Sequence, residues 1–252
     1  MTPTAMRKSS KPLQVAGVAV MLTLMAGCSP TPDAYVRQRE QMVQSQIVSR
    51  GVTDEGTLRA MRQVPRHRFV PVDEVSNAYA DTPLPIGGGQ TISQPYMVAA
   101  MTELVRARAG QRVLEVGTGS GYQAAVLATI VDTVFTVEIL PALAEMARDR
   151  LYALGYTNVV TRSGDGYLGW PEHAPFDAIV ITAAAEEIPA PLIAQLKEGG
   201  RLVIPVGSPY DVQTLVVGEK RNGEFLRREV MPVRFVPMQR NASGDDQHRD
   251  GQ

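Results

Sequence analysis

Strand patterns and helical patterns alternate through the middle of this chain, between residues 112 and 207. Helical patterns cover Tyr122 to Thr129, Pro141 to Leu154 and Pro189 to Leu196. Short runs rich in Val, Ile and Leu read as strands at RVLEVG, TVFTVE, NVVTRSGDG, FDAIVITAA and GRLVIPVG. Strands with little polar alternation predict a sheet covered on both faces. Strand–helix alternation predicts parallel pairing with right-handed crossovers, so we expect an α/β fold with a doubly wound, mostly parallel sheet.

Helical patterns also precede this core. Apolar residues at roughly helical spacing predict a helix from Ala34 to Gly51, and Thr53 is expected to cap a second helix that stops at Pro65. Ser93 is a preferred capping residue, and a proline suits the first turn of a helix. A further helix is therefore expected from about Pro95 to Ala107, and the fold should carry helical additions on its N-terminal side.

Strands of a different kind are expected after the core. The stretches QTLVVGEK, EFLRREV and VRFVP predict antiparallel strands, with Asn222-Gly223 as the turn between the first two. From about Asn241 the chain is polar, and this tail is predicted to be disordered. The predicted organisation is a leader and linker over residues 1–33, one domain over residues 34–240, and a tail over residues 241–252.

The first 33 residues have the order of an export signal. Basic residues stand at positions 7, 8 and 11, and no acid appears before Asp33. The apolar run from Val15 to Met25 is shorter than the roughly 20 residues that span a bilayer. The stretch LMAGC resembles a bacterial lipobox, which makes Cys28 a candidate lipid anchor. We favour this lipoprotein signal over an upstream extension from a misplaced start codon.

Charge and cysteine content argue against several classes of protein. The formal net charge is −1, without the basic surplus of a nucleic-acid binder, so no nucleic-acid partner is expected. Cys28 is the only cysteine, which rules out an internal disulfide and a cysteine-based zinc site. The three histidines, at positions 67, 173 and 248, lack the spacing of metal ligands, and no metal is expected.

The stretch VLEVGTGSGYQ carries the strongest local signal for a ligand site. A buried strand ends there in Gly117-Thr118-Gly119-Ser120-Gly121, and a helix begins. Glycines let the backbone adopt positive φ and approach a ligand, and the helix start offers free N–H groups. A ligand is expected at the carboxyl ends of the strands. Taken alone, the loop could also be a tight strand–helix turn.

The residues around this loop distinguish between two kinds of ligand. The dinucleotide pattern G-x-G-x-x-G is not met, because Gly121 comes one residue early and Tyr122 holds the expected position. Glu115, before the loop, can face an ammonium group, and Glu138, at the end of the second strand, can accept hydrogen bonds from two ribose hydroxyls. Asp165-Gly166 follows the third strand, where an adenine amino group could be read. This series resembles the class I methyltransferase fold, which binds S-adenosylmethionine.

The sequence also resembles a narrower family, the protein-L-isoaspartate O-methyltransferases. The stretch PIGGGQTISQP, from Pro85 to Pro95, is the most distinctive part of that family, and most other class I methyltransferases lack it. The resemblance covers about Val36 to Met238. Its further motifs are VPRHRFVP, VLEVGTGSGYQAAVLA, GDGYLGW, PFDAIVITAAAEEIP, LKEGGRLVIPVG and VRFVP.

The resemblance implies an activity. The chain is expected to transfer a methyl group from S-adenosylmethionine to the free α-carboxylate of L-isoaspartyl residues and to the side-chain carboxylate of D-aspartyl residues in age-damaged proteins. The resulting ester closes to a succinimide faster than the free acid does, and repeated cycles restore aspartate. An ionised carboxylate needs no general base, so catalysis would rest on alignment and on exclusion of water. Gly87 to Gly89 would act as a hinge over the site.

The resemblance also implies residue roles. Ser93 matches the active-site serine of the family and is expected to orient the acceptor carboxylate, with Thr91 and Ile92 beside it in the substrate site. The competing role of Ser93 is the helix N-cap. His67 is expected to be structural or to lie on the substrate side, and Trp170 is expected in the core. The residues expected to bind the cofactor are Glu115, Gly117, Thr118, Gly119, Ser120, Gly121, Tyr122, Glu138, Asp165 and Gly166.

Three rival functions stay open at this point. They are a class I methyltransferase with another acceptor, a dinucleotide oxidoreductase, and a lipid-anchored binding protein without activity. The segment from Pro85 to Pro95 argues against the first, Tyr122 against the second, and the intact acids and glycines against the third. The resemblance implies a location in the cytoplasm, where S-adenosylmethionine is made, whereas the leader implies export and anchoring through Cys28. A monomer is expected.

Overall fold

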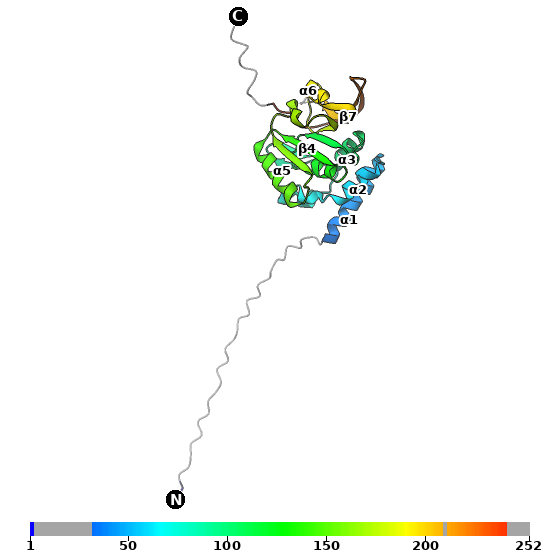
Figure 1. Cartoon of the computed structure of the whole chain (residues 1–252). Coiled ribbons are helices and arrows are strands. Elements are labelled where there is room, and N and C mark those ends of the chain that lie inside the picture. The colour runs from blue at the N-terminus through cyan, green and yellow to red at the C-terminus, as the bar shows by residue number, and fades with distance from the viewer. Residues whose placement is uncertain (3–31, 209–210, 241–252) are drawn as a thin grey trace. The chain divides into compact units, whose positions relative to one another are not determined.

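A seven-stranded sheet in the order β5-β4-β3-β6-β7-β8-β9 lies at the centre of this computed structural model, which describes residues 1–2, 32–208 and 211–240 (Figure 1). The strands β3 to β7 pair in parallel, and β8 and β9 are antiparallel to their neighbours. This confirms the expected doubly wound, mostly parallel sheet with antiparallel strands at its C-terminal side. The strands are β3 (Arg112–Val116), β4 (Thr133–Glu138), β5 (Val159–Ser163), β6 (Phe176–Ile181), β7 (Leu196–Val206), β8 (Gln213–Arg221) and β9 (Glu224–Val233).

Helices cover both faces of this sheet. Val113 and Val134 belong to a core shared with the N-terminal helices, while Leu114 and Phe135 belong to a second core on the other face. Both faces of the sheet are therefore buried away from solvent, which explains why apolar and polar residues do not alternate along the strands. The α-helices are α1 (Pro32–Met42), α2 (Glu55–Gln63), α3 (Pro95–Leu104), α4 (Tyr122–Ala128), α5 (Pro141–Ala153) and α6 (Ala190–Ala194). A π-helical turn covers Val43–Ile47, and 3-10 helices cover Val48–Arg50, Arg66–Arg68, Val72–Asn77, Gly166–Leu168 and Pro171–His173.

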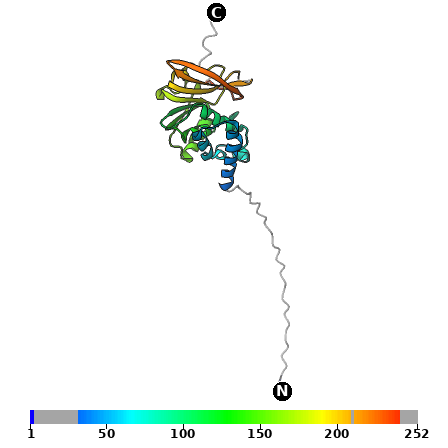
Figure 2. The ribbon, with the colours of Figure 1, turned by 90° about the vertical axis from the view of Figure 1, so that its right-hand side faces the viewer.

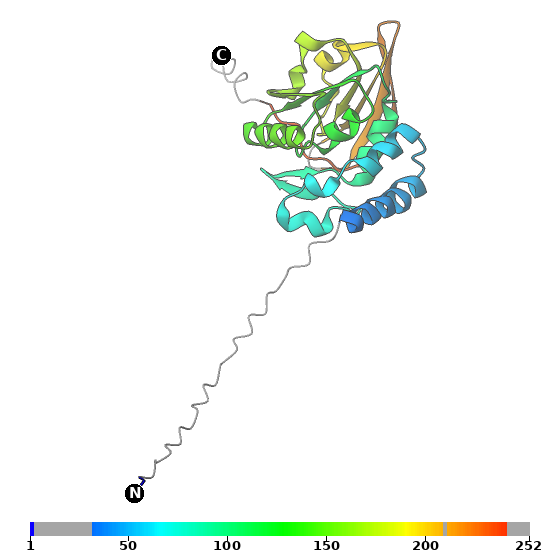
Figure 3. The same cartoon turned by 60° about the horizontal axis from the view of Figure 1, so that its bottom comes forward.

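The helices before the core lie where they were predicted, but the α-helix of the first segment covers only Pro32–Met42, and π-helical and 3-10 turns continue it. The first helical segment ends at Gly51, whose φ of 90° is left-handed and closes the last turn. The cap of α2 is Asp54, whose carboxylate accepts a hydrogen bond from the Thr57 N–H at 2.7 Å, so the prediction of Thr53 was wrong by one residue. The helices α1 and α2 lie side by side (Figure 3).

The glycine-rich stretch before α3 is a hairpin rather than an open loop. Its strands are β1 (Leu84–Gly87) and β2 (Gln90–Ile92), paired antiparallel. Leu84 pairs with Ile92, and both side chains are buried. Gly88-Gly89 form the tip with φ of 60° and 72°, which glycine adopts without strain. The expected hinge therefore corresponds to the tip of an ordered hairpin, and the apolar residues of that hairpin attach it to the core.

The start of α3 differs from the prediction. The N-cap is Gln94, which makes no side-chain capping bond within the helix and instead donates to Asp81 Oδ1 at 2.8 Å. Ser93 is not the cap, so that competing role was wrong. The helix also ends at Leu104 rather than at Ala107, because Arg106 adopts a left-handed φ of 55°. As a result, the Ser93 hydroxyl is not used to hold the helix.

The C-terminal strands form a hairpin at an edge of the sheet (Figure 2). Asn222-Gly223 is the turn between β8 and β9, as predicted. The stretch VRFVP is not a further strand of the sheet, because β9 runs on to Val233 and the rest crosses back over the fold. There the Ala184 N–H donates to the Val236 carbonyl at 2.8 Å, and the Met238 N–H donates to the Ala184 carbonyl at 2.7 Å.

The predicted leader, with its candidate lipid anchor at Cys28, and the predicted tail from residue 241 lie outside the described residues. The division of the chain at residues 33 and 240 therefore stays a prediction. Within the described ranges, no helix has the length and apolar character needed to cross a bilayer.

Candidate active site

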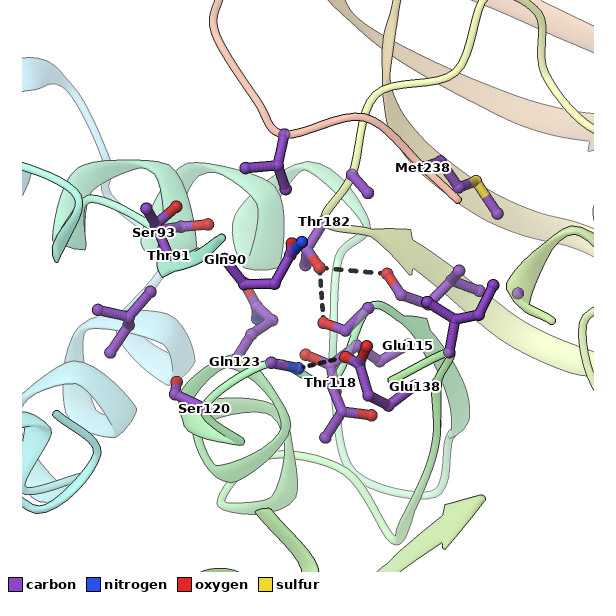
Figure 4. Close-up of a pocket in the computed structure, with 18 of the residues that line it drawn as sticks. Gln90, Thr91, Ser93, Glu115, Thr118, Ser120, Gln123, Glu138, Thr182 and Met238 are labelled. Carbon is purple, nitrogen blue, oxygen red and sulfur yellow. Dashed lines mark hydrogen bonds between the residues drawn. The ribbon is translucent and has the colours of Figure 1, made fainter. Parts of the chain in front are cut away.

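A cavity lies at the carboxyl ends of β3 and β4, where the glycine loop meets the hairpin. Figure 4 shows Thr91 and Ser93 on one side of it, Glu115, Thr118 and Glu138 on the other, and Gln90 between them. The C-terminal segment from Val236 to Gln239 also lines it. This is the edge at which open α/β sheets bind ligands.

The glycine loop follows β3 in a shape that a side chain would disturb. Gly117 has a φ of 95°, and a Cβ there would lie 2.4 Å from Thr182 Oγ1. The Thr182 hydroxyl faces the loop at hydrogen-bond distance from the carbonyls of Val116 (3.1 Å) and Gly117 (2.7 Å). Thr182, which follows β6, therefore sets the path of the loop, and it does so only because residue 117 is glycine.

Glu115 is completely buried beside this loop and has one oxygen without a partner. Its Oε2 accepts a hydrogen bond from Thr136 Oγ1 at 2.5 Å. The Thr136 hydroxyl lies 2.6 Å from Thr118 Oγ1, and since Thr136 uses its only hydrogen on Glu115, Thr118 is the donor of that second bond. Glu115 Oε1 lines up with no donor among the described residues. A buried oxygen of this kind costs free energy unless a ligand supplies a donor.

The environment of Glu115 favours its protonated form in the unliganded protein. The pKa of Glu115 is raised to about 8, chiefly by burial and in part by the negative charge of Glu138, while the Thr136 hydroxyl and the Ala124 backbone oppose the shift. A cationic group placed at Oε1 would reverse this balance, because it would stabilise the carboxylate. The site is therefore suited to an ammonium group.

Glu138 ends β4 and points back at the loop. Its Oε2 accepts from the Gly119 N–H at 2.8 Å, and its Oε1 accepts from the Leu140 N–H at 3.1 Å. Each oxygen keeps lone-pair capacity after one such bond. The backbone thus holds the carboxylate at the cavity wall, in a position to accept hydrogen bonds from hydroxyl groups of a ligand.

The remaining predicted cofactor residues divide into two groups. Thr118, Ser120, Tyr122 and Gly166 line the cavity, and a Cβ on Gly166 would lie 2.4 Å from Val116 Cγ1. Gly121 and Asp165 are not among its lining residues. Gly121 packs under Leu151, and Asp165 Oδ1 accepts from the Tyr167 N–H at 2.9 Å as a cap of the following 3-10 turn.

The predicted substrate residues come together on the hairpin side of the cavity. Thr91, Ile92 and Ser93 all line it, with Ile92 buried, Ser93 half-buried and Thr91 exposed. Among the described residues, the Ser93 hydroxyl has no hydrogen-bond partner. Ser93 is thus a free hydroxyl at the cavity, reachable from outside.

Two residues singled out from the sequence are structural. His67 stacks on Tyr35 with ring centroids 3.9 Å apart, and its Nδ1 lies 2.8 Å from the Tyr79 hydroxyl. Burial and the charges of Arg39 and Arg68 lower the pKa of His67 to about 4, so it is neutral at pH 7. Trp170 is buried in the second core, as predicted.

Sequence reasoning missed several residues of the site. Thr136 and Thr182 were read only as parts of strands, and Gln123 only as part of a helix. The segment from Val236 to Gln239 was read partly as a strand, yet it closes one side of the cavity. No local spacing indicates these positions, since they meet the glycine loop only through the tertiary fold.

Comparison with known proteins identifies the group to which this geometry belongs. A family model described as protein-L-isoaspartate(D-aspartate) O-methyltransferase matches residues 37–243. The chain belongs to this family. A protein-L-isoaspartate O-methyltransferase from Opitutus terrae is 55% identical over 223 residues, covering 88% of this chain and 96% of the relative. A second, from Polaromonas, is 59% identical over 186 residues, covering 73% of this chain and 88% of the relative.

Solved structures of this methyltransferase family have the same architecture. One protein-L-isoaspartate O-methyltransferase superposes with a TM-score of 0.73 at 32% identity, over 79% of this chain and 65% of that chain. A β-aspartate methyltransferase from Plasmodium falciparum, in complex with S-adenosyl-L-homocysteine, superposes with a TM-score of 0.70 at 27% identity. That alignment covers 81% of this chain and 99% of that chain.

Proposed function

We propose that the chain transfers a methyl group from S-adenosylmethionine to the free α-carboxylate of L-isoaspartyl residues, and to the side-chain carboxylate of D-aspartyl residues, in damaged proteins. The observation that carries this proposal is a single cavity with two different walls. One wall holds the glycine loop and two carboxylates, and the other holds the Gln90 to Ser93 segment with a free hydroxyl. Family membership over residues 37–243 supports the same activity.

The residues of the first wall fit S-adenosylmethionine. The unpartnered Glu115 Oε1 suits the ammonium group of its amino-acid part, and the two Glu138 oxygens suit ribose hydroxyls. Gly117, Thr118, Gly119, Ser120 and Tyr122 would form the floor, because the glycines leave room for close approach. Gly166 would lie under the adenine, with Asp165 acting through the turn that it caps.

The residues of the second wall would handle the acceptor. The bound cofactor supplies an activated methyl group on a sulfonium. The acceptor carboxylate is ionised at neutral pH, so it needs no base, and neither His67 nor any other described histidine lies at the cavity. Ser93 would donate a hydrogen bond to one carboxylate oxygen and direct the other toward the methyl group. Ile92 and Thr91 would exclude water around it, and Ser93 itself would not attack.

A repair assay tests this proposal. An isoaspartyl peptide is incubated with the protein, with or without S-adenosylmethionine, and its isoaspartyl and aspartyl forms are separated by chromatography. We expect conversion to the aspartyl form only when the cofactor is present. If the cofactor binds and no conversion occurs, the alternative of a class I methyltransferase with a different acceptor takes its place.

We propose a location in the cytoplasm, on family resemblance, and a monomeric protein. The alternative is export and anchoring through Cys28, as the lipobox-like leader indicates. Cell fractionation of the full-length chain and its Cys28→Ala variant distinguishes the two. A soluble-fraction protein that is unchanged by the substitution fits the first, whereas membrane association lost in the variant fits the second. Sedimentation of the purified protein tests the monomer.

A further inference from the structure

The turn between β8 and β9 is built from the only Asn-Gly pair in the chain, Asn222-Gly223. Both residues have left-handed φ, 53° and 80°, as a two-residue hairpin of this type requires. Both are exposed, and a Cβ on Gly223 would meet no atom within 4 Å. The space around the Gly223 Cα is therefore open next to the short amide side chain of Asn222.

An Asn-Gly pair in such a place can react with itself. The backbone nitrogen of the glycine loses its proton and attacks Cγ of the asparagine, so that a C–N bond forms and the side-chain nitrogen leaves as ammonia. The product is a succinimide. Water opens this ring at either carbonyl, and opening at the α-carbonyl gives an isoaspartyl residue with a free α-carboxylate. The sequence of steps consumes one water and needs no oxidant or other co-reactant.

One carboxylate holds both backbone N–H groups of this turn. Glu198 Oε1 accepts from the Asn222 N–H, and Glu198 Oε2 accepts from the Gly223 N–H at 3.2 Å. A negative charge next to an N–H group favours the protonated amide over its anion, and the anion is the form that must attack. The hydrogen bond also directs the Gly223 N–H toward Glu198 and limits rotation of the turn.

An acid–glycine pair elsewhere in the chain shows the effect of a packed environment. Asp165-Gly166 has the same order, but a Cβ on Gly166 would lie 2.4 Å from Val116 Cγ1, and Asp165 is held by the Tyr167 N–H. Packing and the Tyr167 hydrogen bond together restrain ring closure there. A Cβ on Gly223 would meet no atom within 4 Å, so at Asn222-Gly223 the hydrogen bonds to Glu198 are what restrains ring closure.

We propose that Asn222 is a site of succinimide-dependent deamidation in this chain, and that Glu198 restrains the reaction. The isoaspartyl product at residue 222 carries the acceptor group of the proposed function, so another copy of the enzyme can methylate it. This second step rests on the proposed function, whereas the first step does not.

The first step is tested with Glu198→Gln, which keeps the size of the side chain and removes its charge. Wild type, Glu198→Gln and the matched control Glu229→Gln, an exposed acid on β9, are incubated at neutral pH and digested. Mass spectrometry of the peptide that contains residue 222 measures the fraction in which the side-chain –NH2 has been replaced by –OH. We expect conversion several-fold faster in Glu198→Gln than in wild type, and no change in Glu229→Gln. Equal rates in all three, or slower conversion in Glu198→Gln, would overturn the proposal, the latter because Glu198 would then act as a base.

The second step is tested on aged Glu198→Gln protein, mixed with fresh wild-type protein and labelled S-adenosylmethionine. A synthetic isoaspartyl peptide serves as the control acceptor. We expect label on the peptide that contains residue 222. Label on the control peptide alone would overturn the proposal that the enzyme methylates its own residue 222. No label on the control peptide would overturn the proposed function, but the deamidation measured at residue 222 by mass spectrometry would still stand.

Discussion

Thr136 donates a 2.5 Å hydrogen bond to Glu115 Oε2 across neighbouring strands, where the two residues are register partners of β4 and β3. Because this bond occupies Oε2, the free oxygen of the buried carboxylate is Oε1, at the cavity. Thr118, in the glycine loop, lies 2.6 Å from the same hydroxyl. The loop, the strand and the carboxylate are thus joined by one short chain of hydrogen bonds.

Replacing Glu115 by Gln is expected to weaken cofactor binding. A hydrogen bond to a charged group contributes about 1.5–3 kcal/mol, so the Kd for S-adenosylhomocysteine should rise by about tenfold to about a hundredfold. Isothermal titration calorimetry measures this Kd. The exposed Glu187→Gln serves as a control for loss of a negative charge elsewhere. An unchanged Kd in Glu115→Gln would mean that Glu115 does not meet the ligand.

Cofactor affinity is expected to depend on pH through Glu115. Its pKa is about 8 in the unliganded protein, so below that pH a proton must leave before the carboxylate can pair with an ammonium group. Affinity for S-adenosylhomocysteine should therefore rise from pH 5.5 to 7.5, by up to about tenfold per unit. Titrations in this range check the slope, and Glu115→Gln should remove it. An equal slope in the variant would assign the dependence to another group.

The same group is expected to affect stability. The pKa of Glu115 is raised from 4.5 to about 8 by folding, so the unfolded state loses its proton first. This contribution to the free energy of unfolding is fully present below about pH 4.5 and is lost as pH rises through about 8. Urea unfolding at several pH values, compared between wild type and Glu115→Gln, isolates it. The assignment would be contradicted if the free energy of unfolding of wild type rose, relative to that of Glu115→Gln, as the pH is raised from about 4.5 to about 8.

Gly117→Ala is expected to lower the free energy of unfolding more than Gly199→Ala does. Its left-handed φ costs about 1–2 kcal/mol, and contact of the Cβ with Thr182 Oγ1 adds about 1–3 kcal/mol. Gly199 also has a positive φ, 76°, but a Cβ there meets nothing within 4 Å. Gly199→Ala should therefore cost only the backbone part. Chemical denaturation gives both values, and equal losses would show that Thr182 moves aside.

Ser93→Ala is expected to affect the acceptor and not the fold. Since Ser93 does not cap α3, the free energy of unfolding should change by less than about 0.5 kcal/mol. The value of kcat/KM for an isoaspartyl peptide should fall by about tenfold to about a hundredfold, as one hydrogen bond to a charged oxygen is lost. The Kd for S-adenosylhomocysteine should stay the same. The exposed Ser76→Ala is the control, and a loss of stability without loss of kcat/KM would make Ser93 structural.

The core of the fold could be predicted from the sequence because its signals are local. The run TVFTVE predicts a strand and Asn222-Gly223 predicts a turn from local sequence alone, and both were found where expected. The failures occurred where two neighbouring residues compete. Asp54 is the cap in place of Thr53, because its carboxylate accepts from the Thr57 N–H within the helix. Gln94 is the cap in place of Ser93, and its side chain bonds Asp81 outside the helix.

The candidate site could be predicted only in part, for a related reason. Glu115 and Glu138 stand directly at strand ends, so the sequence pattern locates them. Thr136 and Thr182 reach the glycine loop across the sheet, and their spacing in the sequence carries no sign of it. Asp165 stands at the expected strand end, but its bond to Tyr167 became visible only in the folded chain.

The identity of the methyl acceptor is tested with a matched pair of peptides. The protein is incubated with S-adenosylmethionine labelled in the methyl group and with two peptides that differ only in an isoaspartyl or a normal aspartyl linkage. The label is read as base-labile ester, released as methanol. We expect label on the isoaspartyl peptide alone. Label on both peptides equally, or on neither while S-adenosylhomocysteine still binds, would contradict it.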